Sequence, residues 1–265
     1  MAKVLEVHEL AKSFGGVQAV KNLSFDLAEG QLLAMIGPNG AGKSTCFNLI
    51  NGQLRPDYGR VVIMGEKING YKPRQVWKLG VGRTFQITST FASMTVLENI
   101  KMAVLSHHRQ TQSLFSKVRR LYNDESMELL KLVGIEDQHD RACGVLAYGD
   151  LKRVELAVAL ANQPKLLLMD EPTAGMGPAE RQSLMELTSN IVRNQTIGVL
   201  FTEHDMNVVF THADRIIVLN RGELVAEGTP AEVRENNKVQ EIYLGKGNRE
   251  EFGSRNSEVG KKDGV

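Results

Sequence analysis

Apolar and polar residues alternate along the first part of the chain. Val4 to Leu10 and Val20 to Leu27 follow a two-residue period, which is typical of antiparallel strands at an exposed edge. Arg60 to Met64 predicts another strand. We therefore expect a small antiparallel sheet in the N-terminal part of the protein.

A different pattern, the compact apolar run, occurs at four places along the chain. Such runs suit strands that are buried on both faces of a parallel sheet. Helical stretches separate them, and this alternation predicts β-α-β units around one parallel sheet. The four runs are Leu32 to Ile36, Lys165 to Asp170, Thr196 to Phe201 and Arg215 to Leu219.

Between the first and second of these runs the pattern becomes nearly all helical. Thr95, with Glu98 three residues later, forms a capping-box sequence that predicts the start of a helix. Ser113 to Val133 and Asp150 to Asn162 predict two more helices. We expect this block, about residues 87–163, to form an inserted helical subdomain.

Composition narrows the class of protein. The 265 residues are 42% apolar and 24% charged, as in an ordinary globular protein with one large α/β domain or two small ones. Lysine plus arginine number 32 and aspartate plus glutamate 31, so we expect no nucleic-acid partner. No stretch approaches the roughly 18 apolar residues of a membrane-spanning helix, so other chains would supply any membrane spans. Residues 246–265 are rich in glycine and charge and predict a disordered tail.

The loop that follows Leu32 to Ile36 is the clearest candidate site. It fits the phosphate-binding pattern G-x-x-x-x-G-K-[ST] between a predicted strand and a predicted helix. Its glycines let backbone N–H groups turn toward phosphate oxygens, and the next helix aims its positive dipole end there. Lys43 can reach the β- and γ-phosphates and the Ser44 hydroxyl can bind Mg²⁺, so the loop predicts binding of a nucleoside triphosphate. Its residues are Gly37, Pro38, Asn39, Gly40, Ala41, Gly42, Lys43, Ser44 and Thr45.

Four polar residues outside this loop are candidates for the chemistry. Asp170 and Glu171 end an apolar run, where Asp170 can hold Mg²⁺ through water and Glu171 can polarise an attacking water. An acidic turn is the simpler alternative. His204 follows the run Thr196 to Phe201, so it can sense the γ-phosphate at a strand end. Gln86 precedes the helical block and can bridge the Mg²⁺ site to it; its spacing alone leaves this open.

A second candidate anion site precedes the predicted helix from Asp150. Gly149 lies near the start of that helix, where backbone N–H groups can bind an anion. Glycine before a helix is common, so this segment says little by itself. Its residues are Leu146, Ala147, Tyr148, Gly149 and Asp150.

With these motifs in this order, the chain resembles an ABC-type ATPase subunit over about Val4 to Gly245. The resemblance implies an α/β fold, namely a P-loop NTPase (RecA-like) parallel-sheet core with an N-terminal antiparallel β subdomain and an inserted helical subdomain. It places the ATP-binding domain at residues 1–245 and implies ATP and Mg²⁺ as cofactors.

The resemblance also assigns roles to single residues. The loop from Gly37 matches Walker A, and Asp170 ends Walker B. Glu171, His204 and Lys43 are the implied catalytic residues: the carboxylate, the switch histidine and a cation that neutralises phosphate charge. Gln86 matches the Q-loop. Gln86, Ser44 and Asp170 match the residues that bind Mg²⁺ in the family. Phe14 matches the aromatic residue that stacks on adenine. Leu146, Ala147, Tyr148, Gly149 and Asp150 match the signature motif, which acts across a dimer.

The amino-acid sequences of several segments are similar to those of one branch of the family, the ATP-binding subunits of branched-chain (hydrophobic) amino-acid importers. Examples are Phe14-Gly-Gly-Val, Gly82-Arg-Thr-Phe-Gln and Ile242-Tyr-Leu-Gly. The resemblance implies a second ATPase subunit, as a homodimer or with a related paralogue, two integral membrane permease subunits and an extracytoplasmic solute-binding protein. It implies a peripheral position on the cytoplasmic face of the inner membrane.

Other functions stay open at this point. The ATP-binding subunits of urea and amide importers share much of the sequence of these segments. Those of a lipid or polysaccharide exporter would carry the same ATPase motifs. A soluble ABC-type ATPase of DNA repair or translation usually has coiled-coil insertions or tandem domains, which this chain lacks. A P-loop kinase would leave the signature-like segment and His204 unexplained.

Three positions depart from the family pattern. Ala147 replaces the usual serine and removes a hydroxyl contact worth on the order of 1–3 kcal/mol. Asp150 replaces the usual glutamine and puts a carboxylate near phosphate, although aspartate caps a helix well. Gly177 stands where the D-loop commonly has aspartate. We expect these changes to slow or desymmetrise a site without abolishing activity.

Overall fold

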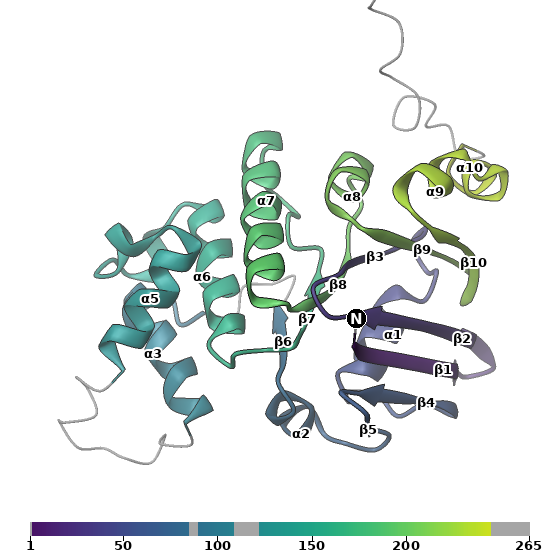
Figure 1. Ribbon diagram of the computed structural model, residues 1–265, viewed down its shortest axis with the longest axis horizontal. Helices are drawn as coiled ribbons and strands as arrows, with labels where there is room; N and C mark the ends of the chain where they lie inside the picture. The colour runs from purple at the N-terminus through teal and green to yellow at the C-terminus, as the bar shows by residue number, and fades with distance from the viewer. Residues whose placement is uncertain (1, 85–89, 109–121, 245–265) are drawn as a thin grey trace, which may run out of the picture.

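The computed structural model describes residues 2–84, 90–108 and 122–244. Its strands form two sheets, and helices cover the larger one (Figure 1). The strands are β1 Lys3–Phe14, β2 Val17–Ala28, β3 Leu32–Ile36, β4 Tyr58–Ile63, β5 Glu66–Lys67, β6 Val81–Thr84, β7 Leu166–Asp170, β8 Gly198–Thr202, β9 Arg215–Asn220 and β10 Glu223–Gly228. The α-helices are α1 Lys43–Ile50, α2 Pro73–Lys78, α3 Val96–His107, α5 Asn123–Val133, α6 Tyr148–Leu160, α7 Pro178–Gln195, α8 Met206–His212, α9 Pro230–Glu235 and α10 Asn237–Leu244; the 3₁₀ turns are η1 Glu136–Gln138 and η2 Cys143–Val145.

The N-terminal antiparallel sheet has the strand order β2-β1-β4-β5. Its predicted strands are confirmed, although β1 and β2 are each twelve residues long and extend beyond the predicted segments. β1 lies between β2 and β4, so it is not an edge strand as its pattern had indicated.

The second sheet has the order β10-β9-β3-β8-β7-β6. All four predicted parallel strands are present, and β6 joins them as a further parallel strand that the sequence had not indicated. The prediction of a wholly parallel sheet is wrong at one edge strand, because β10 runs antiparallel to β9. Arg221 and Gly222 have φ values of 50° and 84°, which allow this tight reversal. β8 begins at Gly198 rather than Thr196, since Thr196 is left-handed and ends α7.

The central strand β3 explains why its sequence is a continuous apolar run. Leu32, Ala34 and Ile36 belong to the apolar cluster that the helices α6, α7 and α8 cover. Leu33 and Met35 face the other cluster, which α1 and the antiparallel sheet share. Both faces of the larger sheet are therefore covered, and all five side chains of β3 are buried.

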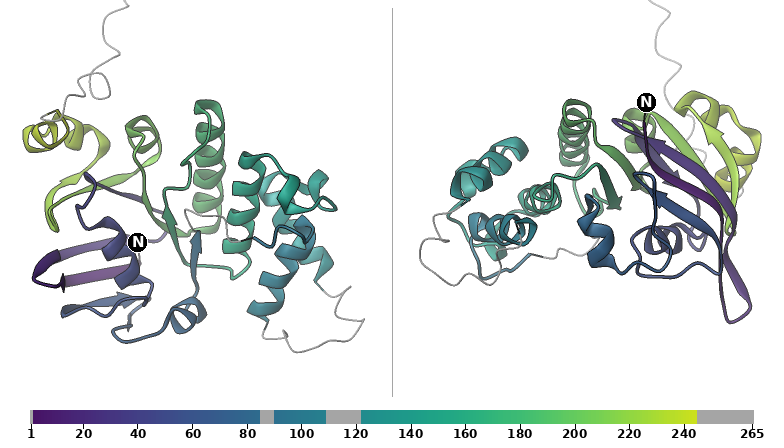
Figure 2. Two further views of the ribbon diagram at one scale, coloured as in Figure 1. Left: turned by 180° about the vertical axis from the view of Figure 1, so that it is seen from behind. Right: turned by 60° about the horizontal axis from the view of Figure 1, so that its bottom comes forward.

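The helices α3, α5 and α6 pack on one another at the end of the molecule opposite the antiparallel sheet (Figures 1 and 2). The predicted capping box is confirmed: Thr95 N donates to Glu98 Oε2 at 2.9 Å, and Glu98 N donates to Thr95 Oγ1 at 3.2 Å. The predicted helix Ser113 to Val133 is wrong at Tyr122, which is left-handed with φ of 67°; α5 begins after it. α6 begins at Tyr148, before the predicted Asp150.

Some sequence predictions fall on other parts of the chain. Residues 113–121 and the tail 246–265 lie outside the described residues. The limits of the ATP-binding domain, 1–245, and of the helical subdomain, 87–163, stay predictions. Among the helices that the structure describes, none has both the length and the hydropathy required to cross a membrane.

Candidate functional site

Three loops meet at one edge of the larger sheet. β3, β8 and β7 are parallel neighbours, so their carboxyl ends point the same way. The loop after β3 begins at Gly37, the segment after β8 contains Glu203 to Asp205, and the segment after β7 begins at Glu171. In open α/β sheets, ligands bind beside these carboxyl ends of the strands. We refer to this side of the sheet as the loop edge.

The phosphate-binding pattern forms a tightly packed turn between β3 and α1. Gly37 and Gly42 have φ values of 153° and 104°, which favour glycine. A Cβ atom at Gly37 would lie 2.1 Å from the Leu219 carbonyl oxygen, and one at Gly42 would lie 2.3 Å from that of Ala19. The loop therefore needs glycine at both positions, for backbone conformation and for space.

Lys43 is the first residue of α1, and its side chain folds back over the loop. The Nζ atom donates to the Gly37 carbonyl oxygen at 2.7 Å and to that of Pro38 at 3.3 Å. Burial lowers the pKa of Lys43, while the negative charges of Glu171 and Asp170 oppose this decrease. The predicted cation and the predicted acidic pair therefore lie near one another. Ser44, the next residue, is exposed.

The acidic pair at the end of β7 is fixed by the neighbouring strand. Thr202 Oγ1 donates to Asp170 Oδ1 at 2.8 Å, and the Glu171 backbone N–H donates to the same hydroxyl at 3.1 Å. Glu171 has φ of 49°, so the chain turns sharply there and aims its side chain away from the strand direction. An Arg83 guanidinium nitrogen lies 3.7 Å from Asp170 Oδ2. Neither Thr202 nor Arg83 was predicted from the sequence as a site residue.

The structure brings Glu171 and His204 together. His204 Nε2 lies 2.8 Å from Glu171 Oε1, within hydrogen-bonding distance. The His204 side chain is 53% exposed and that of Glu171 20%, so the pair lies at the surface of the site and not in the core. The imidazole can orient the carboxylate and still face a bound ligand.

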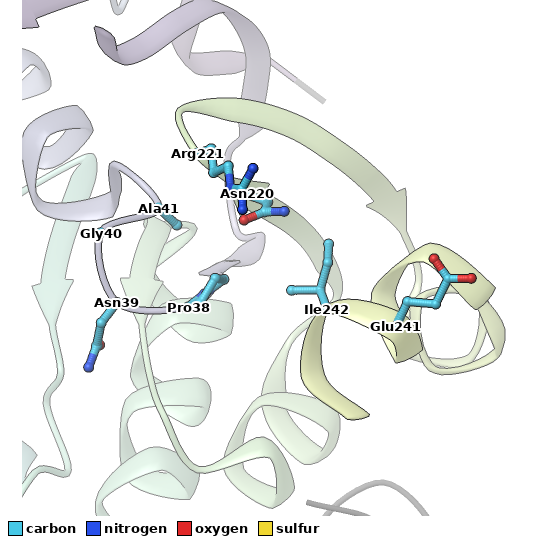
Figure 3. Close-up of a pocket in the computed structure, with 8 residues that line it drawn as sticks. All are labelled: Pro38, Asn39, Gly40, Ala41, Asn220, Arg221, Glu241 and Ile242. Atoms are coloured by element: carbon cyan, nitrogen blue, oxygen red, sulfur yellow. The ribbon is translucent and has the colours of Figure 1, made fainter. Parts of the chain in front are cut away.

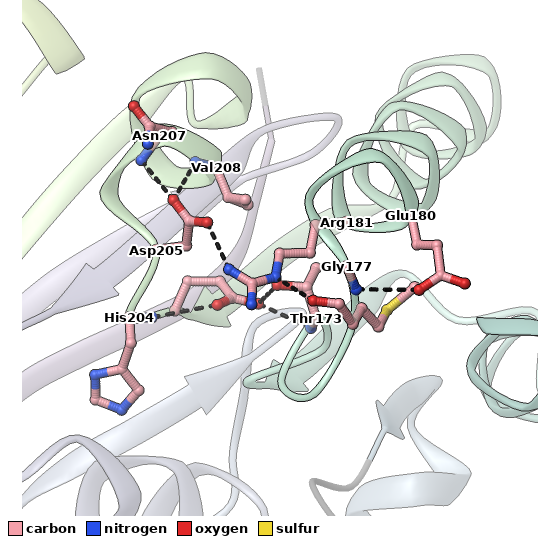
Figure 4. A network of polar contacts seen from close by, with 10 residues as sticks. Thr173, Gly177, Glu180, Arg181, His204, Asp205, Asn207 and Val208 are labelled. Carbon is pink, nitrogen blue, oxygen red and sulfur yellow. Dashed lines mark hydrogen bonds and ion pairs between the residues drawn. The ribbon is translucent and has the colours of Figure 1, made fainter. Parts of the chain in front are cut away.

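A polar network, buried at Thr173 and Glu203, connects the segment after β7 to the segment after β8 (Figure 4). Glu203 accepts hydrogen bonds from Thr173 N at 2.9 Å and Thr173 Oγ1 at 2.7 Å, and burial raises the pKa of its carboxyl. Arg181 of α7 donates to Asp205 Oδ2 at 2.7 Å and to the Met176 carbonyl at 2.7 Å. Residues 173–177 are therefore tied by hydrogen bonds, directly or through Arg181, to the segment that carries His204.

The signature-like segment belongs to a different part of the molecule. It leads into α6, where Ala147 and Tyr148 are exposed. A Cβ atom at Gly149 would lie 3.2 Å from Glu180 Oε1, and one at Gly175 would lie 3.3 Å from the Tyr148 ring. Tyr148 and Gly149 thus lie beside residues 175–180, while Leu146 packs against the larger apolar cluster. Between described residues, no hydrogen bond or ion pair joins this segment to the phosphate loop of the same chain.

The remaining predicted site residues are Phe14 and Gln86. Phe14 ends β1, is 46% exposed and has Lys12 Nζ 5.6 Å from its ring centroid. Ala19, on the next strand of the same hairpin, contacts the phosphate loop at Gly42, so the exposed ring lies on the hairpin beside that loop. Gln86 lies outside the described residues.

Two family models match the chain. The model described as "ABC transporter" matches residues 20–174. The model described as "Branched-chain amino acid ATP-binding cassette transporter" matches residues 223–248. The first match spans the phosphate loop, the acidic pair and the signature-like segment, and the second covers β10, α9 and α10.

Individual proteins are similar over nearly the whole chain. The "High-affinity branched-chain amino acid transport ATP-binding protein LivG" of Salmonella typhimurium is 38% identical, with 91% of this chain and 98% of that protein covered. The "Lipopolysaccharide export system ATP-binding protein LptB" of Haemophilus influenzae is 34% identical, with 91% and 97% covered. The crystal structure of the ADP conformation of MJ1267, an ATP-binding cassette of an ABC transporter, superposes with a TM-score of 0.81 at 29% identity, covering 92% of this chain and all of that one.

Proposed function

Because the chain belongs to the ABC transporter family, we propose that it is the ATP-binding subunit of an importer for branched-chain amino acids. As an ABC ATPase it binds ATP and couples its hydrolysis to transport. The observation that carries the enzymatic part is the meeting of Lys43, Asp170 and the Glu171–His204 pair at one sheet edge. The cargo is supported by the C-terminal family match and by the LivG relative.

The residues at this edge fit a Mg²⁺ ion beside the triphosphate. Mg²⁺ prefers oxygen ligands and keeps several waters. Ser44 offers an exposed hydroxyl, and Asp170 a carboxylate that Thr202 holds in place and that can act through water. The predicted third ligand is Gln86. When bound, the ion would neutralise charge on the β- and γ-phosphates.

The protein side of the reaction follows from the geometry. Lys43 exchanges its bonds with the Gly37 and Pro38 carbonyls for phosphate oxygens, where its charge stabilises the transition state. Glu171 orients a water for in-line attack on the γ-phosphate. His204 holds the Glu171 carboxylate through Nε2 and contacts the γ-phosphate. The imidazole thereby fixes the position of the carboxylate relative to the γ-phosphate.

The complete site requires a second ATPase chain. We place the Leu146 to Asp150 segment of one chain against the phosphate loop of the other, since each chain directs its own segment elsewhere. The partner is a second copy or a paralogue. Closure of the pair would move the helical block against two permease subunits, which an extracytoplasmic binding protein supplies with solute. The chain would then sit on the cytoplasmic face of the inner membrane.

The second candidate is export of lipopolysaccharide, because the LptB relative is nearly as similar as the LivG relative. The match of residues 223–248 favours import of amino acids.

Reconstitution separates the two. The chain is purified with the membrane subunits that bind it and placed in vesicles with the solute-binding protein. We expect leucine to raise ATP hydrolysis several-fold. Stimulation by urea or by lipopolysaccharide, with no response to leucine, would reject the proposed cargo, and failure to recover any membrane partner would favour a soluble ATPase.

A further inference from the structure

The phosphate loop has different surroundings on its two sides along the larger sheet. Toward β9 and β10, a cavity of about 340 Å³ separates the loop from α10 (Figure 3). Neither Ser44 nor Asp170, two of the predicted Mg²⁺ ligands, lines this cavity. Toward β7 and β6, the guanidinium of Arg83 approaches Asp170. Arg83 takes no part in the proposed reaction, yet its charge lies beside a predicted Mg²⁺ ligand.

The pairing of β6 with β7 explains why Arg83 reaches Asp170. Arg83 lies opposite Leu168 in the parallel ladder, and Leu168 belongs to the apolar cluster that α1 and the antiparallel sheet share. Residues two positions apart on a strand point to the same face, so Asp170 follows Leu168 on the face that α1 covers. The Arg83 side chain lies on this face as well and is only 11% exposed.

The guanidinium group of Arg83 contacts α1 and Asp170 at once. Nη1 and Nη2 each donate to Asn48 Oδ1 at 3.3 Å, and Nη1 also donates to Gln53 Oε1 at 3.2 Å. Nη2 lies 3.7 Å from Asp170 Oδ2, which makes an ion pair longer than a hydrogen bond. Burial lowers the pKa of Arg83, and the negative charge of Asp170 opposes this decrease. The two charges therefore interact across the gap between β6 and the end of β7.

The part of α1 that holds the guanidinium also carries a predicted Mg²⁺ ligand. Asn48 lies four residues after Ser44, so the two side chains project from one face of the helix, a turn apart. The Asn48 carbonyl accepts a hydrogen bond from the Gln53 backbone N–H at 2.9 Å, which fixes the turn after the helix. Arg83 thus connects the helix face that carries Ser44 to the carboxylate of Asp170.

Both oxygens of the Asp170 carboxylate consequently have a partner from the same chain. Thr202 Oγ1 donates to Oδ1 at 2.8 Å, and Arg83 faces Oδ2. Each carboxylate oxygen can accept more than one hydrogen bond, so the group can still contact a metal-bound water. Partners behind a ligating carboxylate set its orientation, and their loss typically lowers metal affinity by about 10- to 100-fold. Gln86, the third predicted ligand, follows Arg83 by three residues in the sequence.

We infer that Arg83 is a positioning residue for the Mg²⁺ site: its guanidinium holds the Asp170 carboxylate in a fixed position relative to the face of α1 that carries Ser44. The inference rests on the proposed Mg²⁺ site. Arg83 acts through Asp170, so it serves the affinity for the metal ion and not the binding of the nucleotide itself.

The test is Arg83→Gln in the full-length chain, loaded with a non-hydrolysable ATP analogue. Mn²⁺ prefers the same oxygen ligands as Mg²⁺ and has an EPR signal, so Kd for Mn²⁺ is measured by titration followed by EPR. We expect this Kd to rise by about 10- to 100-fold. Kd for the analogue in EDTA, measured by calorimetry, should stay within about twofold, which also shows that the variant is folded.

Asn48→Ala is a second variant, which keeps the Arg83 charge and removes the acceptor that holds it. Loss of one net hydrogen bond corresponds to about a 2- to 10-fold change in an equilibrium constant. We expect Kd for Mn²⁺ to rise by about that factor, again with an unchanged Kd for the analogue in EDTA. This variant tests the connection to α1 even if Arg83→Gln does not fold, and an unchanged Kd for Mn²⁺ would contradict that connection.

Arg215→Gln is the matched control. Arg215 is also a partly buried arginine, with Nη2 2.9 Å from Asp26 Oδ1, but it begins β9 at the end of the strand away from the loop edge. An unchanged or lower Kd for Mn²⁺ in Arg83→Gln, an equal rise in the control, or an equal rise in Kd for the analogue in EDTA would overturn the inference.

Failure of the underlying proposals gives different results. A wild-type chain that binds the analogue but no Mn²⁺ would overturn the proposed Mg²⁺ site. A wild-type chain that binds no analogue would overturn the proposed function as well.

Discussion

The phosphate-loop edge and the signature-like segment of this protein differ in how they are held. At the loop edge, Lys43, Asp170 and Glu171 are each fixed by hydrogen bonds from the same chain. In the segment Leu146 to Asp150, Ala147 and Tyr148 are exposed. The first region follows the family pattern closely, while the second departs from it at Ala147 and Asp150. Groups that one chain must arrange alone are constrained by that chain's packing, whereas groups that meet a partner can be compensated by the partner.

The two regions also differ in charge. The loop edge combines the buried Lys43 ammonium with two carboxylates whose charges act on it. The other region places Asp150 in the first turn of α6, where the helix dipole favours an anion. A second anion, the γ-phosphate, would have to approach the same helix end. We therefore expect the loop edge to determine whether ATP is bound and cleaved, and the signature region to determine how fast.

The largest effect is expected from Glu171→Gln. The amide keeps the size of the carboxylate but is a poor base, so ATP hydrolysis should fall by about 100- to 1000-fold while ATP binding persists. Hydrolysis is measured as phosphate release from the assembled transporter, and binding by calorimetry. Hydrolysis at the wild-type rate would refute the assigned role of Glu171.

Lys43→Ala should weaken the binding of ATP and not only slow its hydrolysis. Losing a hydrogen-bonded charge at the phosphates corresponds to about a 10- to 100-fold rise in Kd for ATP. Lys131→Ala is the control, because Lys131 is an exposed helix residue paired with Glu128. Unchanged ATP binding in Lys43→Ala would argue against the loop as the nucleotide site.

Asp150→Gln changes the signature-like segment, and it should raise ATP hydrolysis where the two preceding variants impair the site. Removing a carboxylate that repels the γ-phosphate should raise transporter ATP hydrolysis by about 2- to 5-fold at low ionic strength and less at high salt. Asp140→Asn, an exposed acid before the same helix, should leave it unchanged. No change or a loss of activity in Asp150→Gln would show that this carboxylate does not oppose closure.

Glu203→Gln gives the smallest expected effect and concerns the network between residues 173–177 and His204. Because the pKa of Glu203 is raised by burial above its ordinary 4.5, the folded protein binds the proton more tightly than the unfolded chain. Wild-type stability should therefore fall as pH rises through the window above 4.5, and the glutamine variant should lack this component. We expect the Tm of the variant, relative to wild type, to increase from pH 5 to pH 8. A difference that is independent of pH would contradict this assignment.

The sequence could predict those parts of the site that follow directly from strand ends. Asp170 ends a buried apolar run, Gly37 and His204 follow two others closely, and parallel pairing brings such ends together. Thr202 and Glu203 act through residues about 30 positions away, so their roles depend on strand register and on the path of a loop. No local pattern contains that information.

The fold shows the same limit. β3 was predictable because burial on both faces makes it wholly apolar. β10 was not, since it is a short edge strand with glutamates at two of its six positions. The start of α5 after Tyr122 depends on a left-handed backbone conformation, and neither glycine nor proline marks it in the sequence.

The central claim is that each ATP site is completed by the signature-like segment of a second chain. Gly149→Asp tests it most directly, because the new carboxylate would face the γ-phosphate bound to the partner. Outside its own helix, the nearest atoms to its Cβ would be the flexible side-chain ends of Glu180 and Met176. ATP hydrolysis by the assembled transporter is measured together with the Kd of ATP for the isolated chain. We predict a loss of hydrolysis of at least about 10-fold with an unchanged Kd. Unchanged hydrolysis, or a weakened Kd in the isolated chain, would contradict the shared site.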